Sequence, residues 1–275
     1  LYPTLINSFE ILAVLVIVAC VVFFIRRNLL KVSRLTSKDL TGWPSKDANI
    51  ILITEIILML LFLKMNATDT YLQSKGIEPY AAHQTGSFIF SSYAHPWLEY
   101  FSIQTIVFTE RACWWLHIVG VLLFLNYLSR SKHLHIILAF PNAYFARLEP
   151  QGKMKNMPSV QDEVKYAFQP ELAPTGTPEQ AHAFGAKDIN DLSWKNLLDA
   201  FSCTECGRCT SACPANQTGK VLSPRKIMMS TRDRAEEIGK KIEQQIDWKS
   251  EEKSLLYHYI SEEEIRACTT CKIGR

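Results

Sequence analysis

Four cysteines lie within eleven residues in the stretch Cys203-Thr204-Glu205-Cys206-Gly207-Arg208-Cys209-Thr210-Ser211-Ala212-Cys213-Pro214. Their spacing, C-x2-C-x2-C-x3-C-P, is one that wraps a cubane [4Fe–4S] cluster. The first three thiolates fold in a tight loop around one cluster, and the fourth, before Pro214, turns toward a second cluster. Zinc is the alternative, but zinc motifs usually pair two separate short cysteine clusters. The spacing therefore predicts an iron–sulfur electron carrier.

A second motif begins further along the chain, at Cys268-Thr-Thr-Cys271. In two-cluster domains of the ferredoxin type, the fourth cysteine of each motif binds the cluster of the other motif. We therefore predict two [4Fe–4S] clusters. The first takes Cys203, Cys206 and Cys209, and the second takes Cys213, Cys268 and Cys271.

Neither predicted ligand set is complete, because each contains three cysteines. Position 274, where the next cysteine of the second motif belongs, is Gly. Either the second cluster is degenerate, or residues of the protein are missing from this sequence after about Lys272. We favour missing residues, because a half-built cluster site would leave reactive thiols without a purpose.

The other cysteines, Cys20 and Cys113, lie in apolar stretches, where cysteine usually serves as a small buried hydrophobic residue. Six of the eight cysteines are therefore assigned to clusters, which argues against a disulfide framework. Cysteines that bind iron as thiolates must stay reduced, which indicates a reducing compartment, most simply the cytoplasm.

The composition divides the 275 residues into two unlike halves, an apolar one and a charged one that carries the cysteine motifs. We predict a mainly α protein with a transmembrane anchor over 1–148, an extended linker or arm over 149–190, and a dicluster domain over 191–275 that is incomplete at its C-terminus. The net charge is +3, and the sequence has no basic stripe with interleaved aromatic residues, so a nucleic-acid partner is not expected.

Three apolar runs lie at about 5–25, 48–65 and 110–129. The length of each is close to the roughly 20 residues that a helix needs to cross the hydrocarbon core of a bilayer. The first lacks the short core and small-residue cleavage site of a signal peptide. Before the third run, residues 97–109 are predicted to form a short interfacial helix. Lysine and arginine residues at 26–38 and 130–132 predict that these ends face the cytoplasm, with the N-terminus outside and residues 133–275 in the cytoplasm.

His117 and His135 are eighteen residues apart, which is five turns of a continuous helix and places both on one face. His133 would point the opposite way. Ionisable residues inside a membrane are functional candidates. An interfacial position at the headgroups is the alternative for His135.

The segment that runs from Trp114-Trp115-Leu116-His117 through Ser131-Lys132-His133-Leu134-His135 to Pro141-Asn142 is similar to the last span of the gamma subunit of respiratory nitrate reductase. With its cysteine motifs, the chain resembles the membrane-bound heterodisulfide-reductase-like iron–sulfur oxidoreductases. The resemblance implies an electron-transfer subunit of a quinone-linked oxidoreductase in a bacterial or archaeal inner membrane. It also implies a redox partner that carries Cys-Cys-Gly repeats or a flavin.

In that family, the paired histidines of the last span bind two haems b, which here would use His117 and His135. The family takes the other axial ligands from histidines of an earlier span, whereas the second span here offers Thr54, Glu55 and Lys64. Without haem, we expect His117 to pair with Lys64 or Glu110, and His135 with Glu55.

The resemblance and the topology together place a quinone head near the cytoplasmic face, within reach of Glu55, Lys132 or His135. Two other interpretations stay open. The membrane half could be a haem-free structural anchor for the ferredoxin module, or a labile cluster could act as a redox sensor. Arg208 and the backbone amides beside the cysteines are the groups expected to tune the cluster potential.

Local signals in the second half predict its helices. Prolines over 150–180 favour an irregular arm rather than a helix. A short helix over 193–201, capped by Asp191 or Ser193, leads into the first cysteine loop. A longer helix is predicted from Pro224 to about Asp247. A capping box at Ser261 and Glu264 should begin the helix that presents Cys268.

Overall fold

The computed structural model describes residues 2–82, 84–150, 156–172, 185–249, 251–269 and 271. These residues form helices and no β-strand, apart from an isolated bridge between Leu256 and Ile260. The prediction of a mainly α fold is confirmed. The chain divides into two compact units, Leu1–His133 and Leu134–Arg275.

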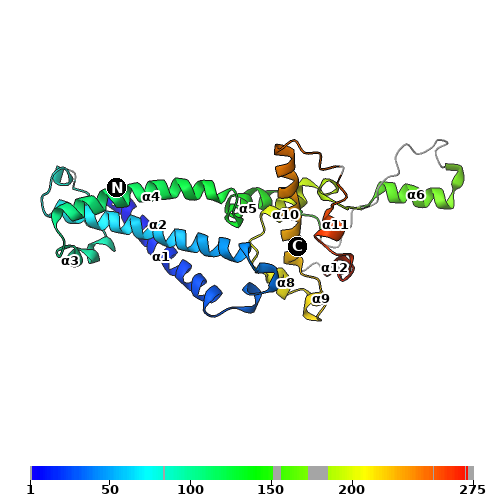
Figure 1. Cartoon of the computed structure of the whole chain (residues 1–275), viewed down its shortest axis with the longest axis horizontal. Helices are drawn as coiled ribbons and strands as arrows, with labels where there is room; N and C mark the ends of the chain where they lie inside the picture. Colours follow the sequence, from blue (N-terminus) through cyan, green and yellow to red (C-terminus); the bar gives the residue numbers. More distant parts are fainter. Residues whose placement is uncertain are drawn as a thin grey trace. The chain divides into compact units, whose positions relative to one another are not determined.

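Three long helices build the first unit: α1 (Tyr2–Asn28), α2 (Trp43–Ser74) and α4 (Ile103–Leu128). All three are long and apolar enough to cross a membrane. Within this unit α2 packs against both α1 and α4 (Figure 1). The 3₁₀ turns η1 (Ser33–Leu35) and η2 (Lys38–Leu40) join α1 to α2. Gly42 then adopts a φ of 85°, which glycine allows without strain, and α2 begins beside it.

Polar side chains tie the helices together where the lysine- and arginine-rich ends meet. The buried Asp47 of α2 accepts a hydrogen bond from the Tyr127 hydroxyl of α4 and one of 3.1 Å from the Lys132 backbone N–H. Asn28 and Asn49 exchange side-chain hydrogen bonds of 3.1 Å between α1 and α2. Buried polar groups need such partners, so these contacts set how the helix ends meet.

The connection from α2 to α4 contains η3 (Tyr80–Ala82), η4 (Ser91–Ala94) and the short helix α3 (His95–Leu98). The predicted interfacial helix over 97–109 is wrong. Ser102 instead caps α4 by accepting a hydrogen bond from the Thr105 backbone N–H, and this cap separates α3 from the long helix.

The expected continuous helix through His117 and His135 is also wrong. Helix α4 ends at Leu128, the chain turns through η5 (Lys132–Leu134), and α5 (His135–Tyr144) begins in the second unit. The Ser131 hydroxyl accepts a hydrogen bond of 3.1 Å from the His133 backbone N–H and supports this turn.

Helix α10 (Pro224–Glu243) is the centre of the second unit and contacts α7 (Trp194–Phe201), α8 (Arg208–Ser211), α11 (Leu255–His258) and η7 (Ile189–Asp191). A buried cluster of Ile189, Ile238, Leu255 and Ile260 joins α10 to the segments that flank it. The remaining elements are α9 (Pro214–Gln217) and α12 (Glu262–Arg266).

The capping predictions for this unit are confirmed. The Ser193 hydroxyl accepts the Asn196 backbone N–H at 3.3 Å and begins α7. Ser261 and Glu264 form the capping box of α12. The expected irregular arm is wrong in part, because α6 (Pro158–Phe168) lies inside it and is followed by η6 (Pro170–Leu172). Proline is tolerated in the first turn of a helix, where its missing N–H has no intrahelical partner.

Candidate iron–sulfur centre

Helix α7 delivers the chain to the first cysteine loop. The Ser202 backbone N–H donates to the Leu198 carbonyl at 2.9 Å, and the Cys203 N–H donates to the Ala200 carbonyl at 3.3 Å. Beyond Cys203 the backbone turns sharply, with φ values of 57° at Glu205 and 73° at Gly207. Glycine adopts this left-handed conformation freely, whereas a residue such as glutamate needs its surroundings to hold it there.

The sulfur atoms of this loop lie partly inside the protein. Cys203, Cys206 and Cys209 are half-buried. Burial raises the pKa of the Cys203 thiol, and the nearby Cys209 adds to this, while the Glu205 backbone N–H, 3.4 Å from the Cys203 Sγ, acts in the opposite direction. A backbone N–H that points at sulfur is one of the contacts that set the potential of an iron–sulfur cluster.

A buried ion pair explains how Glu205 keeps its unusual conformation. Its carboxylate accepts a hydrogen bond of 2.7 Å from the Arg232 guanidinium of α10. The two side chains are 2% and 14% exposed. Burial by itself would lower the pKa of Arg232, but the Glu205 carboxylate raises it, so the guanidinium stays charged. The pair therefore ties the loop between Cys203 and Cys206 to α10.

The fourth cysteine lies beside the second motif. Cys213 is buried in a cluster with Ala215, Leu222 and Ala267, and Ala267 directly precedes Cys268. Helix α12, which leads to Cys268, is held to α10 because Lys226 donates to the two carboxylate oxygens of Glu264 at 2.6 and 2.7 Å. Packing thus brings the loop of Cys213 next to the end of α12.

The donor set suits iron–sulfur chemistry, because thiolates in a tight turn are the ligands that [4Fe–4S] clusters take. Cys268 and Cys271 are exposed. Within the described ranges, no three or more His, Cys, Asp or Glu side chains converge on a point where they could hold a metal ion. Position 274 lies outside the described residues. The ligand type, four cysteine thiols in one loop, therefore fits a [4Fe–4S] cluster.

The histidines have structural partners. The His117 Nδ1 lies 3.0 Å from the Leu58 carbonyl oxygen of α2, and its ring lies 6.0 Å from that of Phe62. The expected pairing of His117 with Lys64 or Glu110 is wrong. Glu110 instead accepts a hydrogen bond of 2.8 Å from the Tyr80 hydroxyl, which is better placed because η3 packs directly on α4.

The three residues predicted near the quinone, Glu55, Lys132 and His135, belong to three different elements, α2, η5 and α5. Glu55 lies 3.7 Å from the His133 Nε2, a pairing that the sequence did not predict. The break after Leu128 puts His133 on the side of Glu55, and His135 begins α5 in the second unit. The Lys132 Nζ donates to the Pro44 carbonyl at 2.6 Å.

Sequence reasoning missed Glu205 and Arg232 and named Arg208, which is exposed, as the charge beside the cluster. A glutamate between two ligand cysteines was the one available signal. Arg232 could not be found from the sequence, because it lies on a charged helix where several basic residues were equally plausible.

Comparison with known proteins supports this chemistry. The sequence profile of the 4Fe-4S binding domain family matches residues 194–215, which contain the first cysteine motif. The chain is 34% identical to the "Probable iron-sulfur-binding oxidoreductase FadF" of Bacillus subtilis (strain 168) over 188 residues, 58% of this chain and 24% of that protein. It is 28% identical to the "EtfAB:quinone oxidoreductase" of Syntrophomonas wolfei over 190 residues, 62% of this chain and 24% of that protein.

A shorter match, with 39% identity over 44 residues, relates 16% of the chain to 7% of a "Probable membrane-anchored ferredoxin" of Chromohalobacter salexigens. The chain thus spans about a quarter of the length of the first two relatives. No solved structure matches it. The chain is therefore similar to iron–sulfur oxidoreductases over part of their length, matches a 4Fe-4S binding domain, and has three helices able to span a membrane.

Proposed function

We propose that this chain is a membrane-anchored electron-transfer subunit of a quinone-linked oxidoreductase of the heterodisulfide-reductase-like class. It would pass electrons between a cytoplasmic redox partner and the quinone pool of the membrane. The observation that carries the proposal is the four-cysteine loop at 203–213 on the same chain as three apolar helices. The name of one relative, an EtfAB:quinone oxidoreductase, supports the link to quinone.

Two [4Fe–4S] clusters would carry the electrons. Cys203, Cys206 and Cys209 would bind the first, and Cys213, Cys268 and Cys271 the second. The packing of Cys213 against Ala267 supports the exchange of the fourth cysteine between motifs. The clusters supply one-electron transfer, and the protein holds the sulfur atoms and shields them from water.

The proposed orientation follows from the charges at the ends of the helices. Arg26, Arg27, Arg34 and Lys132 lie where α1 ends, α2 begins and α4 ends, and basic residues favour the cytoplasmic side. The iron–sulfur domain at 191–275 would then follow the anchor at 1–148 into the cytoplasm of a bacterial or archaeal cell. Thiolate ligands are preserved there.

Quinone would meet the protein at the cytoplasmic end of the anchor. Glu55 and His133 are two titratable side chains 3.7 Å apart, and Lys132 and His135 lie close to His133 in the sequence. Reduction of a quinone consumes two electrons and two protons, so a titratable pair near the ring is chemically appropriate. A subunit that carries Cys-Cys-Gly repeats or a flavin would be the redox partner.

A second candidate function is a haem-free anchor that tethers the ferredoxin module. It is favoured by the tight contact between α2 and α4 one turn from His117. A Cβ at Gly120 would lie 2.7 Å from the Leu58 Cδ2, so the two helices leave no room for a larger group at that point. In the leading proposal, haem b would instead use His117 or His135 as a ligand.

Absorption and low-temperature electron paramagnetic resonance spectra of the purified full chain, before and after dithionite reduction, test these functions. Interacting signals from two reduced [4Fe–4S] clusters are expected. A sharp haem b band would support haem ligation, and its absence from protein prepared with haem supplied would favour the simple anchor. Absence of any iron–sulfur signal after anaerobic reconstitution would overturn the proposed electron transfer.

A further inference from the structure

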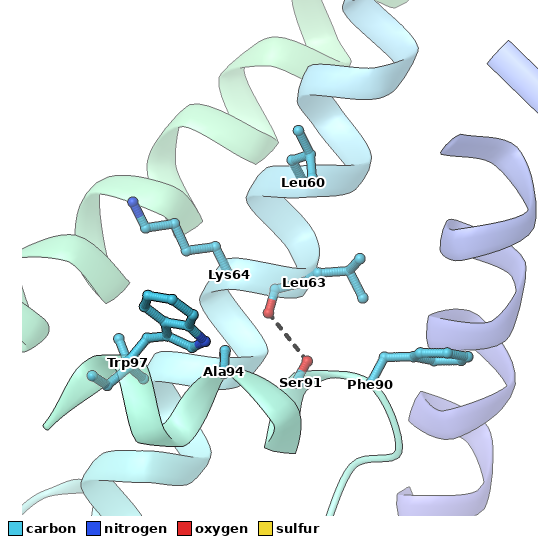
Figure 2. A pocket seen from close by; sticks show the side chains of 9 residues that line it. Leu60, Leu63, Lys64, Phe90, Ser91, Ala94 and Trp97 are labelled. Carbon is cyan, nitrogen blue, oxygen red and sulfur yellow. Dashed lines mark hydrogen bonds between the residues drawn. The ribbon is translucent and has the colours of Figure 1, made fainter. Parts of the chain in front are cut away.

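A pocket of about 450 Å³ opens in the first unit between α2, η4 and α3 (Figure 2). Its walls are almost entirely apolar. Lys64, Ser91 and Trp97 are the lining residues that carry polar side-chain groups. Lys64 and Trp97 extend to the same side of α2, next to one another (Figure 2). The pocket therefore combines an apolar wall with one positive charge.

A buried polar network fixes the rim of this pocket. Glu10 of α1 is 0% exposed. Its carboxylate accepts hydrogen bonds from the Phe90 and Ser91 backbone N–H groups at 2.8 and 3.2 Å, and from the Asn66 side chain at 3.0 Å. The Ser91 hydroxyl also donates to Glu10, and it reaches the Leu63 carbonyl at 3.1 Å. The loop that closes the pocket is thus held in place by α1 and α2.

Among the described residues, no carboxylate forms a salt bridge with the Lys64 ammonium. Glu110 is the carboxylate that shares its surroundings, because both groups act electrostatically on Cys113. The other cations at this end of the bundle are paired, because Lys75 lies 3.7 Å from Glu99 and Arg111 lies 3.3 Å from Glu110. A cation beside an apolar wall favours an anion as its neighbour.

The position along α2 indicates where in the bilayer the pocket lies. Lys64 ends the apolar part of α2, and polar residues such as Asn66 and Thr68 follow it. Trp97 is 73% exposed. Tryptophan gathers at the boundary between hydrocarbon and headgroups, and lysine near a helix end extends its amine toward that boundary. These residue preferences favour a depth near the lipid phosphates for the pocket.

We propose that this pocket binds an anionic membrane phospholipid. The lipid phosphate would meet the Lys64 ammonium beside the Trp97 ring. An acyl chain would lie along Leu60 and Leu63, of which Leu60 is 51% exposed. A quinone fits the apolar wall but is neutral, so it leaves the charge of Lys64 uncompensated. The phospholipid satisfies both features of the pocket.

The test uses the full chain in detergent micelles, with phosphatidylglycerol or phosphatidylcholine of identical acyl chains added. Bound lipid is counted by native mass spectrometry, and thermal unfolding is followed in parallel. Lys64→Met removes the charge, and Lys64→Arg keeps it. Lys75→Met is the matched control, because Lys75 lies on the same helix but is paired with Glu99.

Phosphatidylglycerol should bind the unmodified chain, Lys64→Arg and Lys75→Met, and Lys64→Met should bind it about fivefold more weakly. Equal binding by Lys64→Met would overturn the proposal, as would an equal loss in Lys75→Met. Displacement of phosphatidylglycerol by a neutral short-chain quinone would assign the pocket to quinone and overturn it as well. None of these outcomes depends on the clusters, so the proposed electron transfer is tested separately.

Discussion

Glu205 and Arg232, twenty-seven positions apart in the sequence, form a buried ion pair of 2.7 Å inside the first cysteine loop. Glu205 stands between two predicted cluster ligands, and Arg232 comes from the central helix of the second unit. The pair places one negative and one positive charge near the sulfur atoms of this loop. A cluster bound there would therefore have two balanced charges as neighbours, and its potential would depend on both.

Replacement of Arg232 by Met should leave the Glu205 carboxylate buried without its partner. Loss of one member of a buried pair costs about 3–5 kcal/mol, so the free energy of unfolding should fall by that order. The Glu205 charge, no longer neutralised by Arg232, should also lower the midpoint potential of the first cluster, measured by redox titration with electron paramagnetic resonance.

The double variant Glu205→Gln/Arg232→Met should recover most of the stability, because no buried charge remains. Arg266→Met is the control, since Arg266 pairs with Glu262 on the surface, where an ion pair contributes about 0–1 kcal/mol. A potential that stays unchanged in Arg232→Met would contradict the tuning role.

Single cysteine variants should separate the two proposed clusters. Cys206→Ser should remove the signal of the first cluster and abolish electron transfer, because serine is a poor replacement for a thiolate ligand. Cys213→Ser should spare the first cluster and remove the second. Iron content and electron paramagnetic resonance measure both, with Cys113→Ser as a control that keeps all its iron. Loss of the same signal in Cys206→Ser and Cys213→Ser would refute the exchange of the fourth cysteine.

Replacement of Glu10 by Gln should destabilise the helices of the first unit. The Glu10 carboxylate accepts from two backbone N–H groups and two side chains, and an amide in its place turns an N–H toward donors. A buried donor without an acceptor costs about 1–3 kcal/mol. Thermal unfolding in detergent should show this loss, while Glu99→Gln, at an exposed site, should unfold like the unmodified chain. Similar midpoints for the two variants would count against the network.

The second unit should lose stability in acid through Asp188. Burial by itself would raise the pKa of Asp188, but hydrogen bonds from Arg234, Ile189 and Leu255 outweigh it and hold the pKa below its ordinary value. The stabilisation is complete above the unfolded pKa of about 3.9 and is lost as the pH falls through the lower folded value.

Asp188→Asn should therefore weaken the pH dependence of the free energy of unfolding below about pH 4, with little change in slope at neutral pH. Chemical denaturation of the full chain in acid-stable detergent at several pH values measures this slope. Asp247→Asn serves as the control, because Asp247 is exposed and lies outside α10. Parallel slopes for Asp188→Asn and the unmodified chain would show that other carboxylates dominate.

Much of the fold could be predicted because the signals were local. The apolar runs predicted α1, α2 and α4, and Ser193 and Ser261 predicted where α7 and α12 begin. The third apolar run, predicted to end at about 129, corresponds to the end of α4 at Leu128. The turn that follows could not be predicted, because it is held by the contacts of Asp47 with Tyr127 and Lys132, which come from distant parts of the chain.

The sequence by itself determined the iron–sulfur chemistry and the membrane-spanning length, because cysteine spacing and twenty-residue apolar runs act within one segment. Only the tertiary structure decided which side chains meet. It placed Glu55 near His133 and Arg232 beside Glu205, and it packed Cys213 against Ala267. Such pairings depend on where separate helices end and cross, and no single stretch of sequence contains that information.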